Sequence, residues 1–234
     1  MAWRQACASR GKESGAIVAY EAPSIVCGAL VAASCYTLCM PEFSAFVLAG
    51  GRSSRMGTDK AFLQFEDRTL LARALDSLRA LTPEVRIVGP ADKFAAHGRV
   101  IEDVYPGRGP LAGIHAALSA STTELNLVLA VDLPFVSEAL LRFIVEQARA
   151  ADAVVTVPCI AAGYQPLCAV YRRAFALLAQ AALEAGRNKI EALFADTTTR
   201  ILEEPELGRF AFSAAMFDNL NTPEDLRRAI PEKR

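Results

Sequence analysis

The residues best suited to chemistry follow the first strongly apolar segment after residue 40. Phe43–Leu48 leads into the loop Leu-Ala-Gly-Gly-Arg-Ser-Ser-Arg-Met-Gly-Thr-Asp-Lys-Ala, residues 48–61. Paired glycines let a backbone approach a ligand closely, and successive N–H groups in such a loop can form a nest for anions. Arg52, Arg55 and Lys60 add positive charge that suits a polyphosphate. The loop is neither a Walker A nor a GxGxxG motif, so it predicts phosphate binding of another kind.

Two carboxylates follow later apolar segments in a similar way. Asp103 precedes a stretch rich in glycine and proline, a setting that can hold sugar hydroxyls or base edges. Asp132 follows Asn126–Val131, and a carboxylate there is costly unless it is paired or bound to metal. Because Mg²⁺ takes one or two carboxylates with phosphate oxygens and water, Asp132 is the candidate metal ligand. The alternatives are a turn aspartate at 132 and simple loop punctuation around 103.

The elements that must position these residues alternate between apolar strands and amphipathic helices. Strands are predicted over Phe43–Leu48, Val85–Val88, Arg99–Ile101, Asn126–Val131, Ala153–Val157 and Thr199–Glu203, with an extended segment over Gln165–Tyr171. Helices are predicted over Leu70–Leu81, Leu111–Ser121, Glu138–Ala150, Arg173–Ala185 and Pro223–Ala229, with a short helical piece at Ile190–Phe194. This pattern indicates a three-layer α/β domain with a mostly parallel sheet, whose ligands lie beyond the carboxyl ends of the strands.

Length and composition exclude several classes of protein. The 234 residues suggest one domain, with or without an appendage. The net charge of −1 gives no support for a nucleic-acid or membrane-surface partner bound by bulk electrostatics. With 53% hydrophobic and 22% charged residues, the chain is not of the disordered class. Since no apolar run reaches the roughly 18 residues of a spanning helix, we expect no membrane as partner. The balanced charge likewise predicts no nucleic-acid partner.

The first 39 residues differ from the rest of the chain. They contain four of the six cysteines, and no two cysteines form a CxxC pair, which argues against a zinc ribbon or a thioredoxin motif. Scattered thiols of this kind indicate a reduced compartment. We expect residues 1–39 to be a non-essential extension or the result of a misplaced start, and residues 40–234 to be the functional domain. A secretory signal and a functional helix are the alternatives.

The loop of residues 48–61 resembles the signature loop of nucleotidyltransferases that activate small phosphorylated compounds. Within that group the chain most resembles the molybdenum cofactor guanylyltransferases, from about Phe43 to Leu226. The resemblance implies a Rossmann-like nucleotidyltransferase fold and a cytoplasmic enzyme. It would transfer GMP from GTP to the phosphate of molybdopterin or the molybdenum cofactor, releasing pyrophosphate, with Mg²⁺ as cofactor. Molybdoenzymes and their chaperones are the implied protein partners.

The resemblance also implies roles for individual residues. The nucleotide-binding positions are Leu48, Ala49, Gly50, Gly51, Arg52, Arg55, Lys60, Gly89, Asp103 and Asp132. Lys60 and Asp132 are the catalytic pair, and Asp132 is the metal ligand. Residues 48–50 contact guanine through their main chain, and related cytidylyltransferases have alanine where this chain has Gly50, which favours GTP over CTP. Some relatives carry a nucleotide-contacting asparagine after the second strand, where Gly89 offers only its backbone.

The acceptor side of the cleft is implied by C-terminal motifs. Its candidate residues are Gln165, Arg187, Lys189, Asn219 and Asn221. Asparagine side chains match the donors and acceptors on the edges of a pterin, and the two cations suit its phosphate. The alternative is that the asparagines stabilise a turn and the segment 221–223 simply starts a helix. His97 and His115 are not expected to act as bases. His115 lies on the apolar face of a predicted helix, and His97 lies in a connection between predicted elements.

Two other functions remain open at this point. One is a cytidylyltransferase or a sugar-phosphate nucleotidyltransferase on the same scaffold. The other is a non-catalytic nucleotide-binding module that delivers cofactor. Gly50 and Asp132 favour the enzyme over the non-catalytic module.

Overall fold

The computed structural model describes residues 42–50, 59–220 and 225. Several expectations fall outside these ranges: the character of residues 1–39, the final helix at 223–229, and the site residues Gly51, Arg52, Arg55 and Asn221. Within the described ranges, eight strands form one sheet in the order β10-β7-β9-β6-β1-β4-β5, with β8 beside β7.

The strands of this sheet are short and mostly buried. They are β1 (Phe43–Leu48), β4 (Val85–Val88), β5 (Val100–Ile101), β6 (Leu125–Ala130), β7 (Val155–Ile160), β8 (Gly163–Tyr164), β9 (Cys168–Arg172) and β10 (Thr199–Glu203). Strand β1 pairs in parallel with β4 and β6, β4 with β5, and β7 with β10. Strand β9 runs antiparallel between β6 and β7. The carboxyl ends of β1, β4, β5 and β6 therefore meet at one edge of the sheet, which is mostly parallel as predicted.

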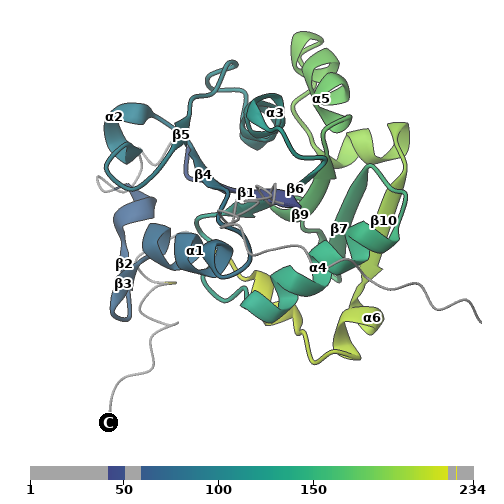
Figure 1. The fold of residues 1–234 in the computed structure, drawn as a ribbon. Helices are drawn as coiled ribbons and strands as arrows, with labels where there is room; N and C mark the ends of the chain where they lie inside the picture. Colours follow the sequence, from purple (N-terminus) through teal and green to yellow (C-terminus); the bar gives the residue numbers. More distant parts are fainter. Residues whose placement is uncertain (1–41, 51–58, 221–224, 226–234) are drawn as a thin grey trace, which may run out of the picture. The chain divides into compact units, whose positions relative to one another are not determined.

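Helices cover both faces of the sheet (Figure 1). They are α1 (Leu70–Arg79), α2 (Ala91–Phe94), α3 (Pro110–Ala120), α4 (Glu138–Ala150), α5 (Phe175–Glu184) and α6 (Glu204–Gly208). Alternate residues of one strand point to opposite faces, so Val47 of β1 packs in the core with α1 and α4, while Phe46 packs with α3 and α5. This is the predicted three-layer arrangement.

The ends of the main helices follow from local capping. The side chain of Thr69 accepts a hydrogen bond from the N–H of Ala72 at the start of α1, and Ser137 accepts one from Leu140 at the start of α4. Gly186, with φ of +73°, follows the end of α5 as the sequence predicts. None of the helices in the described ranges has the length and apolar character of a membrane span.

The structure corrects several predicted boundaries and adds small elements. Residues 165–167 form a turn before β9 rather than part of a strand, and α5 begins at Phe175 rather than Arg173. The predictions missed the hairpin of β2 (Gln64–Phe65) and β3 (Arg68–Thr69), as well as α2 and α6. Three short 3₁₀ helices complete the described chain: η1 (Lys60–Phe62), η2 (Glu191–Asp196) and η3 (Ala214–Phe217).

Candidate functional site

The ends of β1, β4 and β5 are joined by backbone hydrogen bonds around two glycines. The N–H groups of Ala49 and Gly50 both donate to the carbonyl of Val88 at 3.0 Å, and the N–H of Gly89 donates to Ile101 at 3.0 Å. A Cβ on Gly50 would lie 3.5 Å from the Cα of Gly89, an ordinary contact. The two glycines therefore lie side by side at the edge of the sheet where ligands of such folds bind.

Gly89 leaves no room for a side chain. A Cβ at this position would lie 2.8 and 2.9 Å from ring atoms of Phe94, which is fully buried in α2. The ring of Phe94 therefore occupies the space that a side chain at position 89, such as the asparagine that the resemblance implies for some relatives, would need.

Lys60 and Asp132 lie close together at the same edge. The distance from Lys60 Nζ to Asp132 Oδ2 is 3.8 Å, longer than a hydrogen bond, and each side chain is 24% exposed. Burial raises the pKa of Asp132 above its ordinary value, and the nearby charge of Lys60 opposes this shift. The structure thus brings together Lys60 and Asp132, which the sequence analysis predicts as the catalytic pair.

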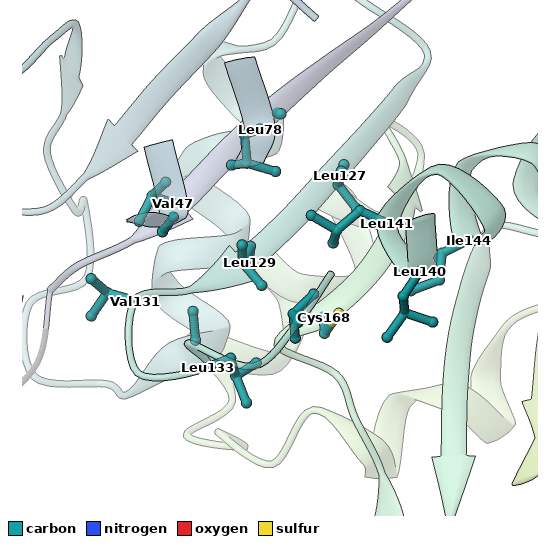
Figure 2. Close-up of a cluster of buried hydrophobic side chains, with 14 of the residues drawn as sticks. Val47, Leu78, Leu127, Leu129, Val131, Leu133, Leu140, Leu141, Ile144 and Cys168 are labelled. Carbon is teal, nitrogen blue, oxygen red and sulfur yellow. The ribbon is translucent and has the colours of Figure 1, made fainter. Parts of the chain in front are cut away.

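The core beneath the sheet edge holds Asp132 in place. Val131 and Leu133, its neighbours in the chain, are buried, and Figure 2 shows them in one cluster with Leu129 of β6 and Cys168 of β9. The N–H of Val131 donates to the carbonyl of Leu48 at 3.2 Å. Because the flanking side chains are anchored in the core, the carboxylate of Asp132 is confined to the edge of the sheet.

The C-terminal segment also contacts Asp132. The N–H of Leu220 donates to the carbonyl of Asp132 at 3.0 Å, and Leu220 itself is buried. This places the exposed Asn219 near the candidate metal ligand. No pattern in the sequence marks Leu220 as the link, because an isolated leucine between two asparagines is also typical of an ordinary turn.

Lys60 follows a residue with two contacts of its own. The carboxylate of Asp59 accepts a hydrogen bond from the N–H of Ala61 at 3.2 Å and another from Lys93 Nζ at 2.9 Å. Asp59 therefore raises the pKa of Lys93. Sequence reasoning missed both residues, although the position of Asp59 next to Lys60 was an available signal.

Asp103 lies in a separate cluster. Its Oδ1 accepts a hydrogen bond from the N–H of Tyr105 at 2.8 Å. The ring of Tyr105 meets His115 edge-on at 5.3 Å, and its hydroxyl donates to Glu184 at 3.3 Å. Burial lowers the pKa of His115, and the charges of Asp103 and Glu184 oppose this shift. His115 is 7% exposed, as its place on an apolar helix face predicted.

Asp103 and Asp132 follow strands that are not neighbours in the sheet. They come after β5 and β6, and since β4 and β1 lie between these strands, the strand ends are three spacings of ~4.8 Å apart, about 14 Å in all. Across ranges 42–50, 59–220 and 225, no three His, Cys, Asp or Glu side chains form a cluster that could hold a metal.

The structure divides the candidate acceptor residues into two groups. Gln165 lies in the turn that precedes Leu167, whose carbonyl accepts a hydrogen bond from Ala130 at 2.8 Å, so Gln165 belongs with Asn219 on the side of Asp132. Arg187 and Lys189 follow the end of α5, where Arg187 forms an ion pair with Asp196 at 3.7 Å. No hydrogen bond or ion pair within the described part of the chain joins these two groups.

Comparison with known proteins identifies the class of enzyme. The family model of the MobA-like NTP transferase domain matches residues 45–200, a range that contains both sheet-edge glycines and the Lys60–Asp132 pair. Together, the three-layer fold and this edge define a nucleotidyltransferase. More particularly, the chain belongs to the MobA-like NTP transferase family.

Curated relatives and solved structures agree with this assignment. The probable molybdenum cofactor guanylyltransferase of Pelotomaculum thermopropionicum is 34% identical over 192 residues, covering 81% of this chain and 93% of the relative. The molybdenum cofactor guanylyltransferase of Desulfosudis oleivorans is 32% identical, covering 81% and 95%. Molybdopterin-guanine dinucleotide biosynthesis protein A from Archaeoglobus fulgidus superposes with a TM-score of 0.71 at 27% identity, covering 80% of this chain and 96% of that one.

The fold alone does not specify the base. The 4-diphosphocytidyl-2C-methyl-D-erythritol synthase of Anaerococcus prevotii shares the fold with a TM-score of 0.59 at 16% identity, covering 80% of this chain and 93% of that one.

Proposed function

We propose that this protein is a molybdenum cofactor guanylyltransferase, which transfers GMP from GTP to the terminal phosphate of molybdopterin or the molybdenum cofactor. The products are the guanine dinucleotide form of the cofactor and pyrophosphate. The curated relatives carry this activity in their names. The structural observation that supports it best is the Lys60–Asp132 pair at 3.8 Å, beside the glycines at the ends of β1 and β4.

The reaction needs no nucleophile from the protein. An oxygen of the acceptor phosphate, already anionic, attacks the α-phosphorus of GTP, and the bond from that phosphorus to the oxygen bridging to the β-phosphate breaks. Catalysis then consists of positioning and charge neutralisation. In our proposal Lys60 neutralises charge on the triphosphate, together with the cationic loop before it, and Asp132 is the protein ligand to Mg²⁺. When bound, Mg²⁺ would neutralise charge on the phosphates and the leaving group.

The main chain at the end of β1 supports the choice of GTP. The N–H groups of Ala49 and Gly50 are already engaged by Val88, so the groups that these two residues can offer to a base are their carbonyl oxygens. The pairing edge of guanine has two N–H donor groups and one acceptor, whereas that of cytosine has one donor group and two acceptors. Carbonyl acceptors therefore suit guanine better than cytosine.

The two groups of acceptor residues suit different parts of a pterin substrate. We assign Gln165, Asn219 and Asn221 to the pterin ring. Arg187 and Lys189 supply positive charge for its phosphate. Asn221→Ala should raise the KM for the acceptor, and an unchanged value would refute the role of that residue. Molybdoenzymes and their chaperones in the cytoplasm are the expected recipients of the product.

The decisive experiment measures pyrophosphate release from GTP, CTP, ATP and UTP, each with Mg²⁺ and molybdopterin. We expect release with GTP only. Release with CTP would favour the cytidylyltransferase alternative, and GTP binding without release would favour a non-catalytic delivery module.

Gly50→Ala sharpens this test. The methyl group would lie 3.5 Å from Gly89 Cα and 3.7 Å from the Val88 carbonyl, so the fold should tolerate it. We expect an unchanged melting temperature and a lower preference for GTP over CTP. A preserved preference in the folded variant would show that position 50 does not select the base.

A further inference from the structure

Lys60 and Asp132 belong to segments that the backbone does not join. In the described ranges, no main-chain hydrogen bond connects residues 59–65 with residues 131–136. Val131 is bonded to β1, and the carbonyl of Asp132 accepts from Leu220. Side-chain packing between the two segments therefore contributes to the 3.8 Å separation of the pair.

One aromatic contact connects these segments directly. The rings of Phe65 and Phe135 are perpendicular, with centroids 5.5 Å apart, which is a favoured edge-to-face geometry. Phe65 lies five residues after Lys60, and Phe135 lies three residues after Asp132. Phe65 is 2% exposed, so its ring has little freedom to move.

The hairpin of β2 and β3 is in turn fixed to helix α1. The guanidinium of Arg73 in α1 lies 4.8 Å from the centre of the Phe65 ring and forms an ion pair with Glu66 at 2.8 Å. Glu66 has a φ of +57°, in the tight turn of the hairpin. The N–H of Leu70 donates to the carbonyl of Leu63 at 3.0 Å and closes the base of the hairpin. Phe65 is thus a rigid support against which Phe135 packs.

We propose that Phe65 and Phe135 are positioning residues for nucleotidyl transfer, because their edge-to-face contact fixes the distance between Lys60 Nζ and the carboxylate of Asp132. Neither ring needs to touch a substrate. The reading of these rings as part of the catalytic apparatus rests on the proposed function, whereas their control of the Lys60–Asp132 distance does not.

A kinetic test compares Phe135→Leu in the wild type and in Lys60→Ala, using single-turnover rates at high enzyme concentration. If Phe135 acts through Lys60, Phe135→Leu should slow the wild type by about tenfold or more. It should change the rate of Lys60→Ala by less than about twofold, because effects that share one route are not additive. Equal factors in the two backgrounds, or no effect in either, would overturn the proposal.

Two further variants control for general loss of packing. The ring centroids of Phe143 and Phe210 are 4.6 Å apart in another aromatic cluster. Because this cluster is separate from the Phe65–Phe135 contact, Phe143→Leu should change the rate by the same small factor in both backgrounds. Phe135→Tyr keeps the ring and should restore most of the wild-type rate. A Phe143→Leu variant that reproduced the non-additivity would show that packing in general, and not this contact, sets the rate.

A structural test does not depend on the reaction. Crystal structures of the wild type and of Phe135→Leu give the distance from Lys60 Nζ to Asp132 Oδ2 directly. We expect a longer or variable distance in the variant. An unchanged distance would overturn the proposal even if the enzyme transfers GMP. Absence of GMP transfer by the wild type, with a lengthened distance in the variant, would refute only the proposed function.

Discussion

The sheet edge where the carboxyl ends of β1, β4, β5 and β6 meet is built differently beside β6 and beside β5. At the β6 end, Lys60 and Asp132 approach each other as opposite charges, 3.8 Å apart and partly buried. At the β5 end, Asp103 is bonded to the backbone of its own loop, and the Tyr105 hydroxyl bridges to Glu184 in α5. The β6 end concentrates charge, whereas the β5 end uses polar groups that bind one another.

This difference indicates a catalytic role for the residues at the β6 end and a structural role for those at the β5 end. Charges that lie near each other in a partly dry site interact strongly with a charged transition state. Groups that are hydrogen-bonded to their own loop mainly determine its shape. Changes at the β6 end should therefore lower turnover more than stability, while changes toward the β5 end should alter stability or affinity more than turnover.

The largest effect is expected from Lys60→Ala and Asp132→Asn. Each should lower turnover by about 10²–10³-fold, because each removes a group that faces charge in the transition state. The melting temperature of Asp132→Asn should change little, since burial already disfavours the ionised form of Asp132. Pyrophosphate release and thermal unfolding check the two statements. Near-wild-type turnover in either variant would contradict the assigned role.

Gly89→Ala should lower stability more than turnover, the reverse of the two preceding variants. The added methyl would lie 2.8 Å from the buried ring of Phe94, so we expect a loss of about 1–3 kcal/mol in the free energy of unfolding. Urea denaturation measures it. Gly98→Ala is the matched control, because the atoms nearest its methyl would lie at 3.6 Å. Equal stability of the two variants would show that the β4 end adapts more easily than its packing suggests.

Asp103→Asn should give a smaller, binding-specific effect. The amide oxygen can still accept from the N–H of Tyr105, so the loop keeps its shape while the charge is lost. We expect GTP to bind about tenfold more weakly, or about 1.4 kcal/mol, with turnover at saturation changed less. Calorimetric titration with GTP measures the affinity. A fall in turnover as large as that of Lys60→Ala would remove the distinction between the two ends.

The smallest effect concerns His115 and pH. Because burial lowers the pKa of His115 below its ordinary value of 6.5, the unfolded chain takes up this proton at a higher pH than the folded protein. The free energy of unfolding should therefore fall as the pH decreases through about 6.5. His115→Asn should flatten this dependence, and His97→Asn, at an exposed position, should leave it in place. Urea midpoints between pH 7.5 and 5.5 would detect the difference.

The elements best predicted from the sequence are those with strong local signals. Strand β1 and helix α4 have the predicted bounds, the strand because it is apolar throughout and the helix because Ser137 caps it before a long amphipathic run. The hairpin and α2 were missed because segments of two to four residues are too short to show a period. The antiparallel direction of β9 left no local signal, since it depends on pairing with β6 and β7.

The site was predictable where position along a strand implies position in space. Residues that follow parallel strands reach the same edge, so Gly50, Gly89, Asp103 and Asp132 could be grouped from the sequence. Their separations could not be predicted, because they depend on strand order: two strands lie between β5 and β6. The supports at Asp59–Lys93 and Phe65–Phe135 were missed for a related reason, since each joins residues far apart in the chain.

The amino-acid sequence by itself determined that the protein is a layered α/β domain with a phosphate-binding loop and an acidic residue after an apolar strand. These properties follow from hydrophobic period, glycine content and charge, which act over a few residues. Only the tertiary structure decided that Lys60 lies beside Asp132 and that the N–H of Leu220 bonds to the carbonyl of Asp132. It also decided that Phe94 excludes a side chain at position 89. Such contacts depend on how distant segments pack, and no local pattern encodes that packing.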